Sequence, residues 1–592
     1  MPSLELNFEI SKKLWGYLGS RRRLQLLLIS LLVVVTSISE VLSIGAVMPF
    51  LGMITSPGAM SKYIDANATV LGLVIHRQKD QMMAFTAAFC IAVVVAGGMR
   101  VLLLWSTARW AAAAGTELGY DAFRRTLYQP YSVHVARNSS EVIAGVTNSV
   151  GTLVYGLSQV VNLVGALIIL LSILIALLFL NPSVACASIL SFGIVYCAVM
   201  LVVKGGLRRN GQVIARESVA LNKCLQESMG GIREIIMDGS ADIYCRQYRL
   251  MDFNLRRAQG GNLFLGASPR YAVESLSMLL IALVAYNLSG SGSGSGLTEH
   301  LPLFGAFVLG AQRMLPAIQT VYLAWATLRG GQESIRNAIS LLDQKIPASA
   351  MASRTNGISF QNIITMEGVS FKYEGNSPWI LRKIDLTVKK GDRLGIVGGT
   401  GSGKSTLLDI LVGLLPPTEG VIKVDGKLLD AESLNGYQAC IAQVPQSVFL
   451  IDGSIEENIA FGVDSALVNS ERIRLAADQA SLSADIERMP DGYRTVVGER
   501  GVRLSGGQKQ RIGIARALYK RAQILVFDEA TSALDSDIEA DVMRAINSLG
   551  GDLTIIIIAH RVSTLAGCNQ IIEVGCGGIK HLQSYDSRSR KS

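Results

Sequence analysis

The residues from Gly398 to Ser405 have the spacing of a loop that binds phosphate. They read Gly-Gly-Thr-Gly-Ser-Gly-Lys-Ser, and they lie between the buried-strand run Leu394–Val397 and the helical run Thr406–Leu415. Glycines let successive backbone N–H groups wrap phosphate oxygens, and the start of a helix adds positive potential. The order of strand, loop and helix favours a nucleotide site over a glycine turn without a ligand.

The predicted loop would bind ATP and Mg²⁺. Lys404 would reach the β- and γ-phosphates and take part in catalysis, and Ser405 would hold Mg²⁺. The residues expected to contact the nucleotide here are Gly398, Gly399, Thr400, Gly401, Ser402, Gly403, Lys404, Ser405 and Thr406.

A second segment places two carboxylates after a predicted strand. The run Ile524–Phe527 is apolar, and Asp528 and Glu529 follow it directly. Ligands of parallel α/β sheets bind at the carboxyl ends of the strands. Asp528 is therefore the candidate Mg²⁺ ligand, and Glu529 is the candidate general base for a hydrolytic water. An acidic helix cap is the alternative interpretation of this pair, and the phosphate loop makes it the weaker one.

A third segment lies between these two. It reads Leu504-Ser505-Gly506-Gly507-Gln508, and a helical run follows it. This pentapeptide resembles the signature motif of ABC ATPases, which is highly specific. The resemblance covers about Ile358 to Gln583, and it implies that Ser505, Gly507 and Gln508 contact nucleotide.

Other positions look like further marks of the same family. The resemblance implies that Tyr373 stacks on adenine, although a strand aromatic is an alternative interpretation. Gln446, in Val444-Pro445-Gln446, looks like the Q-loop glutamine, with a role in catalysis and at Mg²⁺. Asp535 ends a segment that looks like the D-loop and would contact nucleotide. His560, after the strand run Thr554–Ala559, looks like the catalytic switch histidine, although a lone histidine there is otherwise typical of packing.

The family resemblance also implies that two chains work together. The signature loop of one subunit would close on the phosphate loop of the other, so that ATP closes the dimer and hydrolysis releases it. Glu529 and His560 are both present, whereas asymmetric heterodimers of the family often lack one of them in one subunit. A homodimer is therefore favoured, and a heterodimer is the alternative.

The first half of the chain is strongly apolar. Of the 592 residues, 50% are hydrophobic and 17% are charged, and Val142 to Val203 contains no charged residue. A soluble protein would average about 25% charged residues. This composition excludes disorder and argues against a soluble enzyme. The eight cysteines are scattered without a Cys-x-x-Cys pair, so neither a zinc site nor a disulfide framework is expected.

Six apolar runs could cross a membrane as helices, which takes about 20 residues each. They are Leu24 to Ile54, Met82 to Trp105, two runs within Val142 to Val203 that Asn181-Pro182 separates, about Tyr271 to Leu288, and about Leu301 to Thr327. The length of the cytoplasmic connections predicts that the helices continue well beyond the bilayer.

The basic residues give the orientation. The connection from the fourth run to the fifth carries ten Lys and Arg residues from Lys204 to Arg257, whereas Ser289 to His300 has none. The positive-inside rule then places both termini of a multi-pass protein in the cytoplasm. The bacterial inner membrane is what the resemblance to bacterial flippases, described below, implies. The formal net charge of +9 follows from this topology, so nucleic acid is not an expected partner.

The predicted fold is a membrane all-α six-helix domain fused to an α/β P-loop nucleotide-binding domain. We expect the transmembrane domain at residues 1–329, a linker at 330–357 and the nucleotide-binding domain at 358–592. This arrangement resembles an ABC exporter half-transporter. The resemblance implies that two cytoplasmic turns, near Gln129-Pro130-Tyr131 and near Gly230 to Ile235, insert near Gln446.

Arginines in or at the edges of the spans are candidates for substrate binding, because charge in a membrane span is costly. They are Arg100, Arg270 and Arg313. The alternative is that Arg–Glu pairs, such as Arg270 with Glu274, hold helices together.

The segments Leu127–Tyr131 and Ser268–Tyr271 look similar to those of bacterial flippases for lipid-linked oligosaccharides. That resemblance implies an external helix around Tyr63 to Ile75 and a polyprenyl-pyrophosphate glycan as substrate, with membrane lipids as partners. Export of other lipids, peptides or drugs is the alternative function, and a regulatory ATPase without transport is a third.

Overall fold

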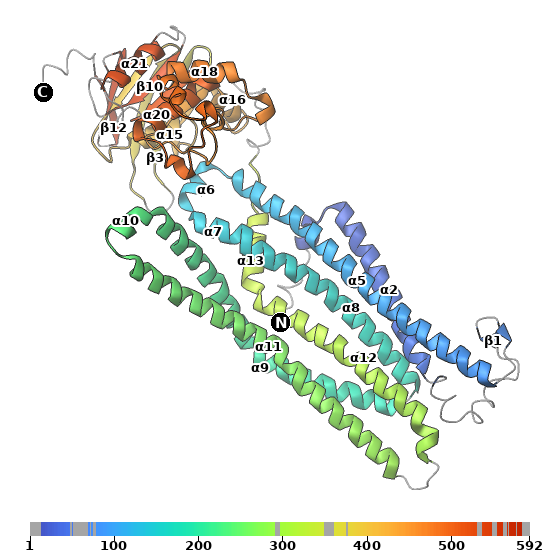
Figure 1. Cartoon of the computed structure of the whole chain (residues 1–592). Helices are drawn as coiled ribbons and strands as arrows, with labels where there is room; N and C mark the ends of the chain where they lie inside the picture. The colour runs from blue at the N-terminus through green and yellow to red at the C-terminus, as the bar shows by residue number, and fades with distance from the viewer. Residues whose placement is uncertain are drawn as a thin grey trace. The chain divides into compact units, whose positions relative to one another are not determined.

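The chain divides into two units in the computed structural model, each described here by itself (Figure 1). Unit 1 comprises Met1–Leu127 and Arg137–Lys345, and unit 2 comprises Tyr128–Ala136 and Ile346–Ser592. The structure describes residues 13–47, 50, 69–70, 73–74, 78–180, 182–290, 296–347, 360–373, 377–529, 536–547, 553–559, 565, 567–575 and 577–582.

Unit 1 consists mainly of long helices (Figure 1). Its helices, long and short, are α2 (Ser20–Gly45), α5 (Gln78–Leu127), α7 (Ser139–Ala144), the π-helical turn η1 (Gly145–Ser149), α8 (Val150–Leu180), α9 (Pro182–Gly230), α10 (Ile232–Met237), α11 (Ala241–Gly290), α12 (Gly296–Gly330) and α13 (Gln332–Leu342).

Each of the six predicted spans overlaps one long helix of this unit: α2, α5, α8, α9, α11 and α12. Helix α5 has 50 residues and is therefore about 75 Å long, whereas the hydrocarbon core of a bilayer is about 30 Å thick. Helices of this length are what the predicted extensions beyond the bilayer require, and the extensions stay a prediction. Over the described residues, Ser20–Gly45, Met82–Leu127 and Ser139–Ile175 are long and apolar enough to cross a membrane.

In the first third of the chain, the predicted end of the first span at Ile54 lies outside the described residues, and the predicted external helix is wrong in part. Helix α2 ends at Gly45, and Val47 and Phe50 are again helical. The region expected to form an external helix instead contains the short antiparallel strands β1 (Thr69–Val70) and β2 (Leu73–Val74). Most of Tyr63 to Ile75 lies outside the described residues.

Unit 2 contains two sheets. In the larger sheet the strand order is β12-β11-β5-β10-β9-β8, parallel throughout except for the antiparallel pair of β11 with β12. Its strands are β5 (Arg393–Val397), β8 (Ile441–Val444), β9 (Ile524–Asp528), β10 (Thr554–Ile558), β11 (Gln570–Gly575) and β12 (Gly578–Leu582).

The smaller sheet is antiparallel, in the order β4-β3-β6-β7. Its strands are β3 (Ile363–Phe371), β4 (Leu381–Lys389), β6 (Glu419–Val424) and β7 (Lys427–Leu428). The predicted α/β fold class of this part of the chain is therefore confirmed.

The helices of unit 2 are short. They are α6 (Tyr131–Ala136), α15 (Lys404–Leu411), α16 (Leu434–Ala439), α17 (Ile455–Ile459), α18 (Ser470–Gln479), α19 (Ser483–Glu487), α20 (Gly506–Lys520) and α21 (Ser536–Asn547). Helix α15 ends four residues before the predicted Leu415, because Gly413 has a left-handed φ of 74° that cannot continue a helix.

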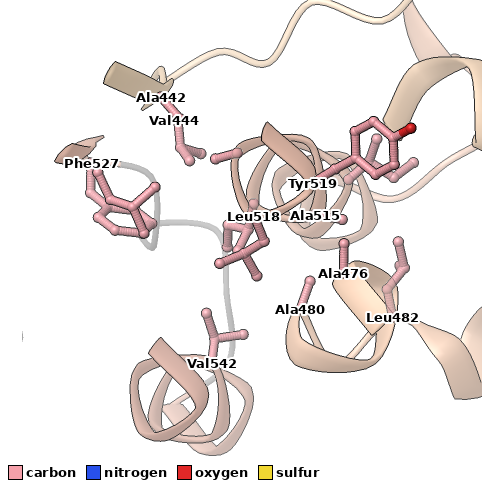
Figure 2. Close-up of a cluster of buried hydrophobic side chains, with 14 of the residues drawn as sticks. Ala442, Val444, Ala476, Ala480, Leu482, Ala515, Leu518, Tyr519, Phe527 and Val542 are labelled. Atoms are coloured by element: carbon pink, nitrogen blue, oxygen red, sulfur yellow. The ribbon is translucent and has the colours of Figure 1, made fainter. Parts of the chain in front are cut away.

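One apolar core fixes α20 against the larger sheet. Ala515 and Leu518 of α20 lie among Ala476 of α18, Val444 of β8 and Phe527 of β9 (Figure 2). All five side chains are buried, so α20 and the end of β9 belong to one packed body.

Candidate nucleotide-binding site

The loop between β5 and α15 requires glycine. Gly398 has a φ of 154°, and a Cβ added there would lie 2.4 Å from the backbone oxygen of Val574. Gly403, directly before α15, has a φ of 98°. Both conformations are left-handed and favour glycine. The loop therefore lies tightly against β11, with the N-terminus of α15 at its end.

Lys404 lies along this loop. Its side chain is buried, and its Nζ donates hydrogen bonds to the backbone oxygens of Gly398 at 2.9 Å and Gly399 at 3.0 Å. The Oγ of Ser402 is buried and has no hydrogen-bond partner among the described residues. A buried ammonium group and an unpaired hydroxyl beside a helix N-terminus fit the phosphates of a nucleotide. Ser405 and Thr406 lie in the first turn of α15.

The sheet order brings the acidic residues to the same edge. Strand β10 lies between β5 and β9, and all three are parallel, so the loop after β5 and the acids after β9 follow the same ends of the strands. Gln446, shortly after β8, donates a hydrogen bond from Nε2 to Oε2 of Glu529 at 2.8 Å.

Glu529 has a backbone conformation that is costly for a non-glycine residue. Its φ is 51°, and its N–H donates to the backbone oxygen of Ile558 at 3.0 Å. Left-handed backbone at a residue other than glycine costs about 1–3 kcal/mol and occurs often at functional sites. In this conformation the carboxylate of Glu529 lies within hydrogen-bond distance of Gln446.

The carboxylates of this edge repel one another. Burial raises the pKa of Asp528, Glu529 raises it further, and Lys404 opposes the rise. Burial and the charge of Asp528 raise the pKa of Asp409 on α15 to about 6. Such a concentration of negative charge suits a divalent cation, for which Asp528, Ser405 and Gln446 are the predicted ligands.

Sequence reasoning did not find Asp409. It follows Ser405 by four residues on the same helix, so the two side chains lie on one helix face. That spacing was the available signal.

The signature segment begins α20. Ser505 is the N-cap: its Oγ accepts from the N–H of Gln508 at 3.2 Å, and Oε1 of Gln508 accepts from the N–H of Ser505 at 3.0 Å. Gly507 is the second residue of the helix. Ser505 is exposed, so the positive end of a 15-residue helix faces solvent. The side chain of Gln508 closes the cap, and its contact with nucleotide stays a prediction.

The adenine-stacking prediction concerns Tyr373, just after β3. Its side chain is 41% exposed, and its ring meets the edge of Phe371 with the centroids 5.1 Å apart. An exposed aromatic face is compatible with stacking, and the role stays a prediction.

Three predicted residues cannot be located. His560 and Asp535 lie outside the described residues, as does the side chain of Arg313 on α12.

The two remaining candidate substrate arginines are in unit 1. Arg270 on α11 is exposed. Arg100 on α5 forms an ion pair with Glu40 on α2, whose side chain is fully buried. A pair that joins two helices is what the alternative interpretation expects of Arg100.

Comparison with known proteins identifies the family. A family model described as ABC transporter matches residues 381–532, and one described as ABC transporter transmembrane region matches residues 25–292. An ATP-dependent lipid A-core flippase of Methylobacillus flagellatus is 30% identical over 492 residues, which is 81% of this chain and 80% of that protein. The chain belongs to the ABC transporter family.

Further similarities agree with an exporter-type half-transporter. A solved bacterial Atm1-family ABC exporter with ATP bound has a TM-score of 0.78 and 25% identity to this ABC transporter, with 97% of each chain covered. An ATP-dependent lipid A-core flippase of Ralstonia nicotianae is 32% identical over 63% of this chain. The chain spans 62% of the length of that relative and 63% of one from Chromohalobacter salexigens.

Proposed function

We propose that this chain is one half of an ATP-driven flippase for a lipid-linked oligosaccharide or a related polyprenyl-pyrophosphate glycolipid. The observation that carries the ATPase part is the hydrogen bond from Gln446 to Glu529 beside the glycine loop. It holds a carboxylate at the strand edge where phosphates would bind. The apolar helices of unit 1 support transport across a membrane, proposed to be the bacterial inner membrane with both termini in the cytoplasm.

The proposed chemistry uses residues of unit 2. Backbone N–H groups of the loop and Nζ of Lys404 would bind the phosphates of ATP. Mg²⁺ would supply positive charge to those phosphates. Glu529, held by Gln446, would accept a proton from the attacking water. His560 would act near the γ-phosphate.

Two observations support a homodimer. Helix α6 belongs to unit 2, whereas α10 belongs to unit 1. Ile236 and Met237 of α10 are 70% and 76% exposed. Because α10 lies in a predicted cytoplasmic connection, lipid would not cover these apolar side chains, and exposed apolar side chains of this kind often mark a protein interface. The ATPase unit of a second copy would cover α10, and its phosphate loop would meet Ser505 and Gly507.

The substrate proposal rests on charge and on similarity. Arg270 and Arg313 would bind pyrophosphate, since a guanidinium group pairs with phosphate in a fork. The named function of the relatives favours a second candidate, a lipid A-core glycolipid. Both candidates are phosphorylated glycolipids. Export of other lipids, peptides or drugs is the remaining alternative.

The test uses proteoliposomes that contain the full chain. A fluorescent polyprenyl-pyrophosphate glycan should cross the bilayer with ATP and stay in place with the Glu529→Gln chain. A lipid A-core glycolipid is assayed in parallel. If neither lipid moves while a different lipid or drug stimulates ATP hydrolysis, the substrate proposal is wrong.

A further inference from the structure

Three helices of unit 1 meet in a very close crossing. A Cβ added to Gly211 of α9 would lie 2.2 Å from the backbone oxygen of Gly330, the last residue of α12. A Cβ on Gly261 of α11 would lie 2.8 Å from Nδ2 of Asn210, and one on Gly330 would lie 2.8 Å from Nδ2 of Asn262. The contact at Gly211 is with backbone, so a larger residue there would force α9 and α12 apart.

A cavity of about 800 Å³ begins next to the crossing. It is lined by α9 from Gln212 onward and by α13 from Glu333 onward, and its third wall includes Ser149 of the π-helical turn η1. Single π-helical turns occur often at functional sites. The volume falls in the usual range of ligand pockets, about 300–1,000 Å³.

The lining of the cavity mixes uncharged polar groups with five charged side chains, those of Arg137, Glu141, Arg216, Lys223 and Glu333. Arg216 pairs with Glu217, and Lys223 pairs with Glu227. Gln212, Asn337, Ser340 and Ser149 contribute amide and hydroxyl groups, which both donate and accept hydrogen bonds. Glu333 is one of the charged lining residues, and it is paired with Arg336 at 2.8 Å. Sugar hydroxyls match this mixture of donors and acceptors.

Two arginines lie one helical turn before the lining of α9 and α13 begins. Arg208 precedes Gln212 by four residues, and Arg329 precedes Glu333 by four. Nη1 of Arg329 donates to Oε1 of Gln332 at 2.9 Å, but its Nε is buried and has no hydrogen-bond partner among the described residues. Arg208 forms no hydrogen bond or ion pair with any residue that the structure describes.

These two positive charges act on each other. Burial lowers the pKa of Arg329, and the charge of Arg208 lowers it further. Like charges brought together at a helix crossing are unfavourable unless an anion joins them. Guanidinium groups bind phosphate, as they bind carboxylate, through paired N–H donors.

The depth of the pair fits a lipid headgroup. Arg208 follows Val203, the end of the charge-free run, by five residues, or about 7.5 Å of helix. Arg329 lies two residues beyond the predicted span that ends at Thr327. Both positions therefore fall at the cytoplasmic boundary of the bilayer.

We propose that Arg208 and Arg329 bind the phosphates of a glycolipid of the cytoplasmic leaflet, and that the adjoining cavity receives its sugars. This loading site rests on the proposed function. It differs from the arginines named above, and it would act before them, on the side where substrate enters.

The test measures binding to the full chain in nanodiscs of zwitterionic lipid. The probe is a farnesyl pyrophosphate that carries a disaccharide, with plain farnesyl pyrophosphate, a neutral alkyl disaccharide and inorganic pyrophosphate as comparisons. The variants are Arg208→Gln and Arg329→Gln, and Arg209→Gln is the matched control, which removes the same charge from the next position on α9. Basal ATP hydrolysis reports that each variant is folded.

We expect Arg208→Gln and Arg329→Gln to weaken the glycosylated probe about tenfold or more, as loss of a charged hydrogen bond does. Arg209→Gln should change binding less than about twofold. Asn337→Leu and Gln212→Leu should weaken only the probe that carries sugars. The neutral alkyl disaccharide should bind poorly to every chain.

Other results would overturn the site. If the three arginine variants bind alike while the wild-type chain still flips lipid, the loading site is wrong and the proposed function stands. If inorganic pyrophosphate binds as tightly as the lipid probe, the site takes free pyrophosphate and the headgroup assignment is wrong. If Arg208→Gln and Arg329→Gln weaken binding but no polyprenyl lipid is flipped by the wild type, the site stands and the proposed function fails.

Discussion

Glu529→Gln separates the chemistry of the proposed ATPase site from its architecture. Oε2 of Glu529 accepts from Nε2 of Gln446 at 2.8 Å, and the amide oxygen of glutamine can accept the same bond. The backbone strain at position 529 is also unchanged, since glutamine has the same backbone requirements as glutamate. The variant therefore keeps the geometry and removes only the base.

The magnitude follows from the role assigned to the carboxylate. General-base catalysis contributes about 10²- to 10⁴-fold to a rate, or about 3–5 kcal/mol of barrier. We expect kcat of ATP hydrolysis by the full chain to fall by that factor. KM should change by less than about threefold, because the carboxylate of Glu529 acts on the attacking water and does not contribute to the binding of ATP. Steady-state hydrolysis and equilibrium binding of a fluorescent nucleotide measure the two quantities.

A second variant tests the support of the carboxylate. Gln446→Leu keeps the base but removes both the donor and a predicted Mg²⁺ ligand, so we expect a fall in kcat of at least about tenfold. A Glu529→Gln chain that hydrolyses ATP within about threefold of the wild-type rate would refute the assignment of Glu529 as the general base.

Three further predictions concern stability, each measured by thermal unfolding of the nucleotide-free full chain. Gly398→Ala should destabilise unit 2 by about 1–3 kcal/mol, because its Cβ meets a backbone oxygen at 2.4 Å. Gly399→Ala, whose Cβ would have nothing within 4 Å, should have little effect. Equal melting temperatures of the two variants would contradict the tight packing of the loop at Gly398. Glu40→Gln should destabilise unit 1 by about 1–3 kcal/mol, since it leaves Arg100 without its carboxylate, and the added change Arg100→Gln should recover part of the loss. Asp409→Asn should raise the melting temperature more at pH 7.5 than at pH 5, because a carboxyl whose folded pKa is raised to about 6 loses stability progressively as pH rises from about 4 through 6. A rise in melting temperature that is the same at both pH values would count against this prediction.

The phosphate loop could be predicted from sequence because all its parts are contiguous. Glycine spacing, the preceding strand and the following helix together specify one local structure, and β5, the loop and α15 follow that order. The contact between Gln446 and Glu529 could not be predicted in this way. The two residues are 83 positions apart, and their contact depends on the strand order β10-β9-β8. The hydrophobic pattern of an individual strand does not show which strands are its neighbours.

The membrane unit shows the complementary limit. Apolar runs located the six helices, since a span has a fixed minimum length. They did not locate the crossing of α9, α11 and α12, because Gly211, Gly261 and Gly330 lie in three separate helices and each is an ordinary helical glycine in its own segment. The pairing of Glu40 with Arg100 also joins residues that the sequence keeps 60 positions apart.

The charged side chains fall into two classes, and the difference separates structural roles from ligand roles. Glu40 and Arg100 neutralise each other inside unit 1, so neither requires a ligand. Asp409 and Asp528 gather negative charge that burial and mutual repulsion make unfavourable. Arg208 and Arg329 gather positive charge in the same way, at the crossing of α9, α11 and α12.

A folded chain keeps such unbalanced charge at a cost, which a bound ion of opposite sign would offset. The acidic residues lie beside the phosphate loop, where a divalent cation is proposed. The basic residues lie where the phosphates of a lipid are proposed. Binding of either ligand should therefore stabilise the unit that holds it, and transport would then couple two binding events of opposite charge in one chain.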